Sequence, residues 1–166
     1  MTLPITYSAA SNAIWDALYN LLNAQAVVGG KLATVKNVIK GGQFAAEIVP
    51  AIAIDLESWS SSWHSSRRRR VVIQYRIYAA ASSMQTPTRV SNLKDARATL
   101  APILDDGAGN GIEAIFGSAS NFAAGNIAWE GYLKAYRSAS EIHEGENQAV
   151  WAYGIYDYEA TTFVTV

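Results

Sequence analysis

The segment Val71-Val72-Ile73-Gln74-Tyr75-Arg76-Ile77-Tyr78 decides the fold, because apolar and polar side chains alternate along it. Its odd-numbered residues share one face of a strand, and Gln74 and Arg76 point to the other. An earlier run, Ile48-Val49-Pro50-Ala51-Ile52-Ala53-Ile54-Asp55-Leu56, also places its isoleucines on one face. Pro50 lacks a donor, which predicts an edge or a bulge there. The two runs predict a long β-hairpin arm, residues 47–79, with one core face and one wetter face.

The segment between these runs, Ser58-Trp59-Ser60-Ser61-Ser62-Trp63-His64-Ser65-Ser66, is rich in serine and tryptophan. We interpret Ser58–Ser66 as the loop at the hairpin tip, with Arg67, Arg68, Arg69 and Arg70 at the base of the returning strand. Four adjacent guanidiniums repel one another, so they need an anionic partner or full exposure to water. Strand alternation predicts Arg67 and Arg69 on one face, and Arg68 and Arg70 on the other.

The length of 166 residues fits one domain, residues 1–166. Half of the residues are apolar and only 16% are charged, against a usual charged share of about 25%. So few charges favour a surface that is buried against other subunits. A neutral surface of Ser, Thr, Asn and Gly is the alternative.

The net charge of −1 conceals an uneven distribution. Residues 1–100 carry 11 basic and 5 acidic side chains, and residues 101–166 carry 2 and 9. This separation suits head-to-tail contacts between identical subunits. The two halves could equally intermix within one fold and cancel.

The chain contains no cysteine, which excludes disulfides and thiolate chemistry. No apolar run approaches the roughly 18 residues that span a bilayer, and the N-terminal residues do not resemble a secretory signal. We therefore expect a product of the reducing cytoplasm with no membrane partner.

Helical periodicity marks residues 8–25, capped by Ser8 or Ser11, and a second helix from a Thr86-Pro87 start through Val90 to Leu104. Pro102 predicts a kink or break in that helix near Ala101. Strands are expected at 34–39, 127–136 and 149–158, a turn at 105–111, one helical turn at 112–116 and an acidic loop at 138–148. The last residues, 161–166, extend the final strand or pair with another subunit. The fold class is α+β, a mostly antiparallel sheet with two helices packed on one face.

Residue patterns for catalysis, metal binding or cofactor binding are weak throughout. His64 and His143 fall in predicted loops without a second ligand at zinc spacing. The run Asp105–Gly111 fails the register of a calcium loop and the spacing of a phosphate loop. Asp55 and Glu57 share a face, but acid–base work also needs a cleft. We predict no enzyme, no metal and no cofactor; a small hydrolase with an unrecognised site is a remaining alternative.

Three interpretations of the arginine run stay open: a solvated hairpin, pairing with the acidic half of a neighbouring subunit, and contact with nucleic acid. Phosphate contacts would give salt-sensitive affinity, and Trp59 and Trp63 would stack on bases. The tryptophans would equally fill a groove on a neighbouring subunit.

The order of these elements resembles a known family, the tail terminator and tail-completion proteins of the tailed-bacteriophage neck. The resemblance rests on the leading helix (Ile14 to Leu22), the Pro50–Ile54 strand, the long hairpin, the helix from Val90 to Leu104 and the aromatic strands from Ala149 to Tyr158. It covers nearly the whole chain as a pattern, without a catalytic signature.

The resemblance implies a virion structural protein that assembles into a ring, usually a hexamer, in the host bacterial cytoplasm. That ring caps the tail tube, stops its polymerisation and docks to the head connector, while genomic DNA passes through the lumen. The hairpin with Trp59, Trp63 and Arg67–Arg70 would reach a neighbouring subunit or ring, and Arg68 and Arg70 are the candidates for contact with DNA in the channel. The alternative is a nucleic-acid-binding module that uses the same arginines and tryptophans.

Overall fold

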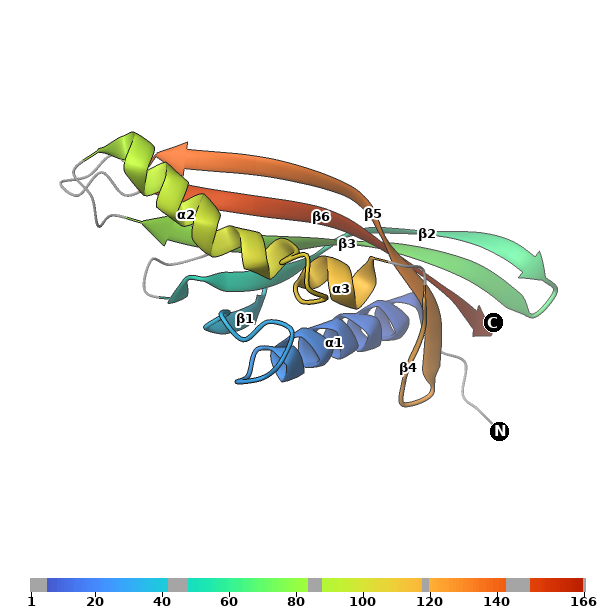
Figure 1. Cartoon of the computed structure of the whole chain (residues 1–166). Helices are drawn as coiled ribbons and strands as arrows, with labels where there is room; N and C mark the ends of the chain where they lie inside the picture. The colour runs from blue at the N-terminus through green and yellow to red at the C-terminus, as the bar shows by residue number, and fades with distance from the viewer. Residues whose placement is uncertain (1–5, 42–47, 84–87, 118–119, 143–149, 166) are drawn as a thin grey trace.

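The computed structural model describes residues 6–41, 48–83, 88–117, 120–142 and 150–165. The helices are α1 (Tyr7–Gln25), α2 (Arg89–Leu104) and α3 (Ile112–Phe116), and the strands are β1 (Asn37–Lys40), β2 (Ala51–Ser65), β3 (Arg68–Ser83), β4 (Ser120–Ala124), β5 (Ile127–Ile142) and β6 (Val150–Thr165). The strands form one six-stranded sheet in the order β1-β2-β3-β6-β5-β4 (Figure 1). The predicted α+β class is confirmed.

Strand β3 lies at the centre of the sheet, antiparallel to β2 on one side and to β6 on the other. Its alternating residues, Val71, Ile73, Tyr75 and Ile77, are completely buried. The facing residues on β2 and β6 continue the same apolar surface. Of the described strands, β1 alone runs parallel to its neighbour, β2, so the prediction of a mostly antiparallel sheet is correct.

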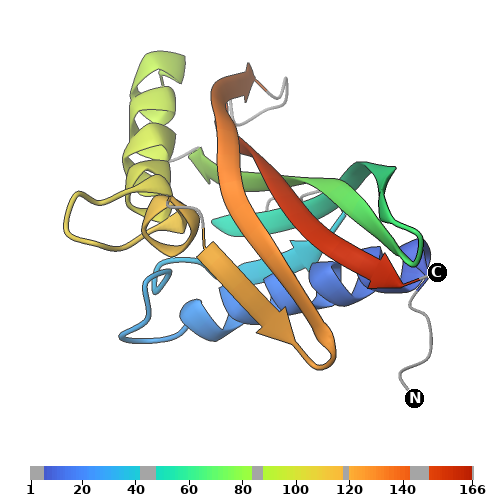
Figure 2. The same cartoon turned by 90° about the vertical axis from the view of Figure 1, so that its right-hand side faces the viewer.

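The helices cover one face of this sheet, and the sheet curls around α1 (Figure 2). In α1, side chains four residues apart form a fully buried stripe: Ala10, Ile14, Leu18 and Leu22. The helix begins at Tyr7, because the hydroxyl of Thr6 accepts a hydrogen bond from the Ala9 amide. The caps predicted at Ser8 and Ser11 are therefore wrong by a few residues.

Helix α2 begins at Arg89 with Thr88 as its N-cap, and the predicted start at Thr86-Pro87 lies outside the described residues. The helix continues through Pro102 to Leu104, so the break expected near Ala101 is wrong. Leu100 and Ile103 are buried on either side of Pro102, and this packing against the sheet offsets the lost backbone hydrogen bond. Val90 is 79% exposed, although it belongs to the predicted apolar stripe.

Several strand boundaries differ from the sequence-based prediction. Pro50 lies just before β2, where its carbonyl accepts a hydrogen bond from the Lys36 amide. The two irregularities of β2 fall later, between Leu56 and Ser58 and between Trp63 and Ser65. Strand β4 was not predicted. The predicted loop 138–148 begins as strand, because β5 pairs with β6 as far as Ile142. Residues 161–165 extend β6, which was one of the two expectations for them.

Strand β5 bends, and because of this bend the last residues of β6 have no strand partner within the described part of the chain on the side where β5 lies. Its first residues pair with β4 and its later ones with β6, from the Glu130–Thr161 pair onward. Gly131 lies where β5 passes from β4 to β6. A Cβ at this position would overlap the buried hydroxyl of Tyr158, so only glycine lets the β5 backbone lie this close to Tyr158. Beyond Thr161, β6 therefore pairs with β3 alone among the described strands.

The described helices include none with the length and apolar character needed to cross a bilayer.

Candidate interaction surface

The outer end of the hairpin extends past the helices (Figure 1), and it carries the tryptophans and arginines predicted to form an interface: Trp59, Trp63 and Arg67–Arg70. Strands β2 and β3 are joined by a two-residue turn at Ser66 and Arg67. The last residues of β6 lie along β3 as far as the Arg68–Thr165 pair. We call residues 58–70 and 161–165 the distal arm, and the rest of the sheet with its helices the body.

The interpretation of Ser58–Ser66 as a loop is wrong. Ser58–Ser65 continue β2 alongside β3, with Trp59 opposite Ile73 and Trp63 opposite Arg69, and only Ser66 belongs to the turn among these nine residues. The physical reason is that pairing uses backbone groups, and β3 is already ordered over this length by its pairing with β6 on the other side. The arginines consequently lie at the tip of the hairpin and not at the base of its returning strand.

The strand alternation predicted for the arginines holds for Arg68, Arg69 and Arg70. Arg69 shares the helix-covered side of the sheet with Val71, and Arg68 and Arg70 lie on the outer side. Arg67 lies in the turn, so strand alternation does not assign it a face.

The helix-covered side of the distal arm carries both tryptophans. Trp59 stacks on Tyr7, the first residue of α1, with ring centroids 4.9 Å apart, and remains 50% exposed. Trp63 is 60% exposed and lies under the Arg69 guanidinium, 4.0 Å from the ring centroid. The Nε atom of Arg69 is buried without a hydrogen-bond partner among the described residues. Each tryptophan thus has one contact and one open face.

The outer side of the distal arm combines aromatic rings with free cations. His64 packs against Phe163 with ring centroids 4.9 Å apart, and Phe163 is 49% exposed. Phe163 also lies directly opposite Arg70. Arg68 and Arg70 are exposed, and in the described part of the chain no ion pair involves any of the four arginines.

The outer face of the body differs, because its charges are paired across strands. Asp157 on β6 accepts hydrogen bonds from Arg76 on β3 at 3.1 Å and from Arg137 on β5 at 3.2 Å. Glu159 accepts hydrogen bonds from Gln74 at 2.7 Å and from Lys134 at 3.0 Å. Burial alone would raise the pKa of Glu159, but these bonds, with one from the Tyr132 hydroxyl, hold it below its ordinary value. Two acids of the C-terminal half are therefore neutralised inside the fold.

A second group of acids is left without cations, around the connection of α2 to α3. Asp105 and Glu113 both lie close enough to Tyr156 to act on it electrostatically, and Glu113 accepts a hydrogen bond from the Tyr156 hydroxyl at 2.8 Å. Burial, followed by this bond, raises the pKa of Tyr156. Asp106 accepts hydrogen bonds from the amides of Ala108 and Asn110, so the turn predicted at Asp105–Gly111 is confirmed.

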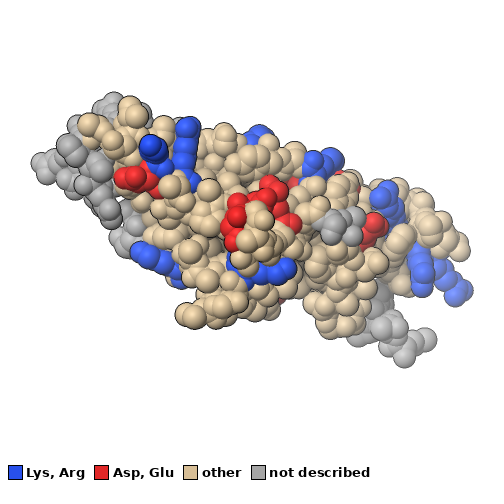
Figure 3. Space-filling model, in the orientation of Figure 1, with Lys and Arg blue, Asp and Glu red and all other residues tan. Residues whose placement is uncertain are grey.

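We call Asp105, Asp106 and Glu113 the acidic corner. Figure 3 shows acidic side chains gathered near the centre of the helix-covered face and basic ones at the arm end. Within the described residues no ion pair involves the acidic corner. Lys31 lies beside it and donates a hydrogen bond to the Ala114 carbonyl at 3.4 Å.

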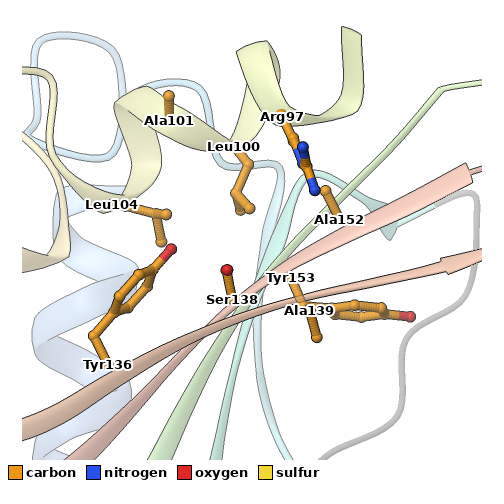
Figure 4. A pocket seen from close by; sticks show the side chains of 9 residues that line it. All are labelled: Arg97, Leu100, Ala101, Leu104, Tyr136, Ser138, Ala139, Ala152 and Tyr153. Atoms are coloured by element: carbon orange, nitrogen blue, oxygen red, sulfur yellow. The ribbon is translucent and has the colours of Figure 1, made fainter. Parts of the chain in front are cut away.

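The acidic corner adjoins two hollows on either side of Tyr136, which is 47% exposed. One, of about 240 Å³, lies between Glu113, Tyr136 and Tyr156. The other, of about 390 Å³, lies between α2 and strands β5 and β6 (Figure 4). Its lining residues are Arg97, Leu100, Ala101, Leu104, Tyr136, Ser138, Ala139, Ala152 and Tyr153. Both are open at the sheet edge, which suits a side chain from another protein better than an enclosed ligand.

Groups for metal binding do not come together in the described residues, where no cluster of three or more His, Asp or Glu side chains could hold an ion. His64 lies on β2 and not in the predicted loop, and His143 falls outside the described residues. Asp55 lies opposite Arg76 on β3, and Glu57 forms an ion pair with that arginine at 3.3 Å. The prediction that the protein is not an enzyme stays a prediction.

The structure brings Trp63 and Arg69 into contact and keeps Arg68 and Arg70 on the opposite face. Sequence reasoning missed Phe163, Tyr7 and the acidic corner. Phe163 could not be found from the sequence, because its place beside Arg70 depends on a register between strands about 90 residues apart in the chain. The surplus of acids after residue 100 was the available signal for the acidic corner.

Searches of protein-family models and of curated proteins find no match to this chain.

Proposed function

We propose that this protein is a virion structural protein of the bacteriophage neck, a tail terminator whose subunits form a closed ring on the tail tube. The ring would dock to the head connector and let genomic DNA pass through its lumen. One observation carries the proposal: the distal arm holds Trp59, Trp63 and Phe163 half-exposed beside four arginines that form no ion pair with any described residue. Tryptophan, aromatic residues and arginine are the side chains enriched at protein interfaces.

The open strand edges also support assembly. From Asp55 onward β2 has no strand partner on the side where β1 pairs with Ala51–Ile54, as far as the described residues extend. Such an edge offers free backbone groups to another chain unless charges or prolines protect it. The distal part of β2 carries serines and tryptophans, and its register with β3 shifts between Leu56 and Ser58 and between Trp63 and Ser65.

The resemblance in element order supplies the identity of the assembly. An α+β subunit with a long hairpin is what that resemblance implies, and the observed class agrees with it. The tail tube protein and the head connector follow from the resemblance as partners. The location would be the virion, after assembly in the host cytoplasm.

The test is the assembly state of the full chain, measured by light scattering over a concentration series and by electron microscopy, alone and with tail tube protein. Closed rings are expected. Replacing Trp63 and Phe163 by serine should weaken the rings, whereas replacing the exposed Val28 and Val90 by serine should not. A particle that remains monomeric at high concentration with tube protein present would contradict the proposal.

A second candidate function, DNA binding, is favoured by one observation: Arg68 and Arg70 are exposed side by side on one face without ion pairs among the described residues. If the arm binds phosphates, affinity for short DNA should fall steeply with salt. Replacing both arginines by alanine should reduce the slope of log affinity against log salt by up to about 2. The control is the alanine pair at the exposed Lys36 and Lys94, and absence of binding at low salt would exclude this function.

A further inference from the structure

Two surfaces of opposite charge remain uncompensated in the described residues, and they lie on different parts of the molecule. The distal arm carries four arginines, and the acidic corner carries three carboxylates with Lys31 beside them. Figures 1 and 3 place the arm beyond α1 and the acidic corner at the α2–α3 connection. One copy therefore cannot join its own arm to its own corner without refolding.

The outer side of the arm is the better partner for carboxylates. Arg69, on the other side, already stacks on Trp63 and is partly buried. Arg68 and Arg70 are exposed, and Phe163 presents an open aromatic face beside Arg70. This side thus offers two free guanidiniums and an apolar anchor next to each other.

The acidic corner offers groups of complementary chemistry. Glu113 and Tyr136 line one hollow together, so a carboxylate and an exposed aromatic ring are neighbours there. Asp105 adds a second exposed carboxylate within electrostatic reach of the same site. A guanidinium pairs with carboxylates and stacks on aromatic rings, so an arginine of another subunit can contact both the carboxylates and the tyrosine ring at this corner.

We propose that the outer side of the distal arm, through Arg68, Arg70 and Phe163, docks on the acidic corner and Tyr136 of a second copy of this chain. This inference rests on the proposed ring and names the contact that closes it. Because two different surfaces meet, the interface is head-to-tail, and repeated head-to-tail contacts close into a ring when the rotation permits. Complementary charge sets the register of such a contact and speeds its formation.

The experiment exchanges the charges of the two surfaces in the full-length chain. One variant carries Arg68→Glu with Arg70→Glu, and the other carries Asp105→Lys with Glu113→Lys. Each variant alone opposes like charges, so we expect its dissociation constant for self-association to rise about tenfold or more. Mixed in equal amounts they should form alternating rings, because each reversed arm then meets a reversed corner and each native arm meets a native corner.

Matched controls apply the same changes of charge elsewhere. These are Lys36→Glu with Lys94→Glu, and Asp95→Lys with Glu130→Lys, all at exposed positions; both should assemble like the unmodified chain. Because Glu113 holds a hydrogen bond to Tyr156, the milder pair Asp105→Asn with Glu113→Gln tests the corner without reversing it. Circular dichroism of each variant separates lost assembly from lost folding.

The outcomes distinguish this inference from the function on which it rests. If the unmodified chain never assembles, the ring itself is wrong. If it assembles and both reversed variants assemble equally well, or the mixture does not recover, only the arm-to-corner contact is wrong. If the arm variant assembles normally but loses DNA binding, Arg68 and Arg70 serve nucleic acid and this contact is wrong.

Discussion

Strands β2, β3 and β6 run through both the body and the distal arm, yet the two regions use the same sheet differently. In the body the helices bury alternate residues of β3, such as Tyr75 and Ile77. In the arm the packing is sparser: Tyr7 at the start of α1 stacks on Trp59, and Thr162 and Val164 are buried. The contrast shows that the body is held by its core, whereas the arm is held mainly by backbone pairing and leaves its tryptophans, Phe163 and Arg70 exposed to another molecule.

The charged side chains on the outer face also differ between the body and the arm. On the outer face of the body, Asp157 and Glu159 neutralise cations from neighbouring strands. On the outer face of the arm, Arg68 and Arg70 have no such acids among the described residues. Charges of the body therefore contribute to the stability of one chain, while charges of the arm are free to contribute to association.

The largest difference in stability between the body and the arm should appear when substitutions at the two ends of strand β3 are compared. Ile77→Ala removes a completely buried side chain under the helices and should lower the free energy of unfolding by about 2–5 kcal/mol. Arg70→Ala on the same strand should change it by less than about 0.5 kcal/mol. Urea denaturation of both variants, at a concentration where the chain is monomeric, measures the contrast. Equal losses would mean that the arm has a core of its own.

A smaller effect should separate paired from unpaired charges. Glu159→Gln weakens the bonds from Gln74 and Lys134 and should cost about 1 kcal/mol at pH 7, since Lys134 is half exposed. Because the pKa of Glu159 is lowered in the fold, its contribution is present above the ordinary pKa of a glutamate and is lost as the pH falls below it.

The stability gap between the unmodified chain and Glu159→Gln should accordingly narrow between about pH 5 and about pH 3. Denaturation curves across this range measure it, with the exposed Glu130→Gln as the control. A gap that is constant with pH would show that the charge of Glu159 does not stabilise the fold.

The smallest effect on stability is expected at the arm. Trp63→Ala removes the stacking of Arg69, which at an exposed site contributes about 0.5–1 kcal/mol. Ser61→Ala, two residues earlier on the same strand, is the matched control. Thermal unfolding of the two variants gives the comparison. A loss for Trp63→Ala as large as that for Ile77→Ala would remove the distinction between arm and body.

The sequence alone was sufficient for the α+β class, the hairpin and the leading helix, because period-two and period-3.6 patterns are local properties of the chain. The tip was misassigned for a physical reason. Serine is common in turns, but the residues from Ser58 to Ser65 are strand because β3 supplies a paired neighbour. The break predicted near the end of α2 was wrong for a similar reason. The packing of Leu100 and Ile103 outweighs the tendency of Pro102 to interrupt a helix.

The sequence alone established the surplus of basic residues before residue 100 and of acidic residues after it. The order of residues in the strand also determined that Arg69 faces away from Arg68 and Arg70. Tertiary structure decided which of those charges are compensated. The β3–β6 register brings Arg76 to Asp157 and Phe163 to Arg70, and the fold leaves the acidic corner far from the arm. Such pairings depend on contacts between residues far apart in the chain, which strand and helix periodicities do not specify.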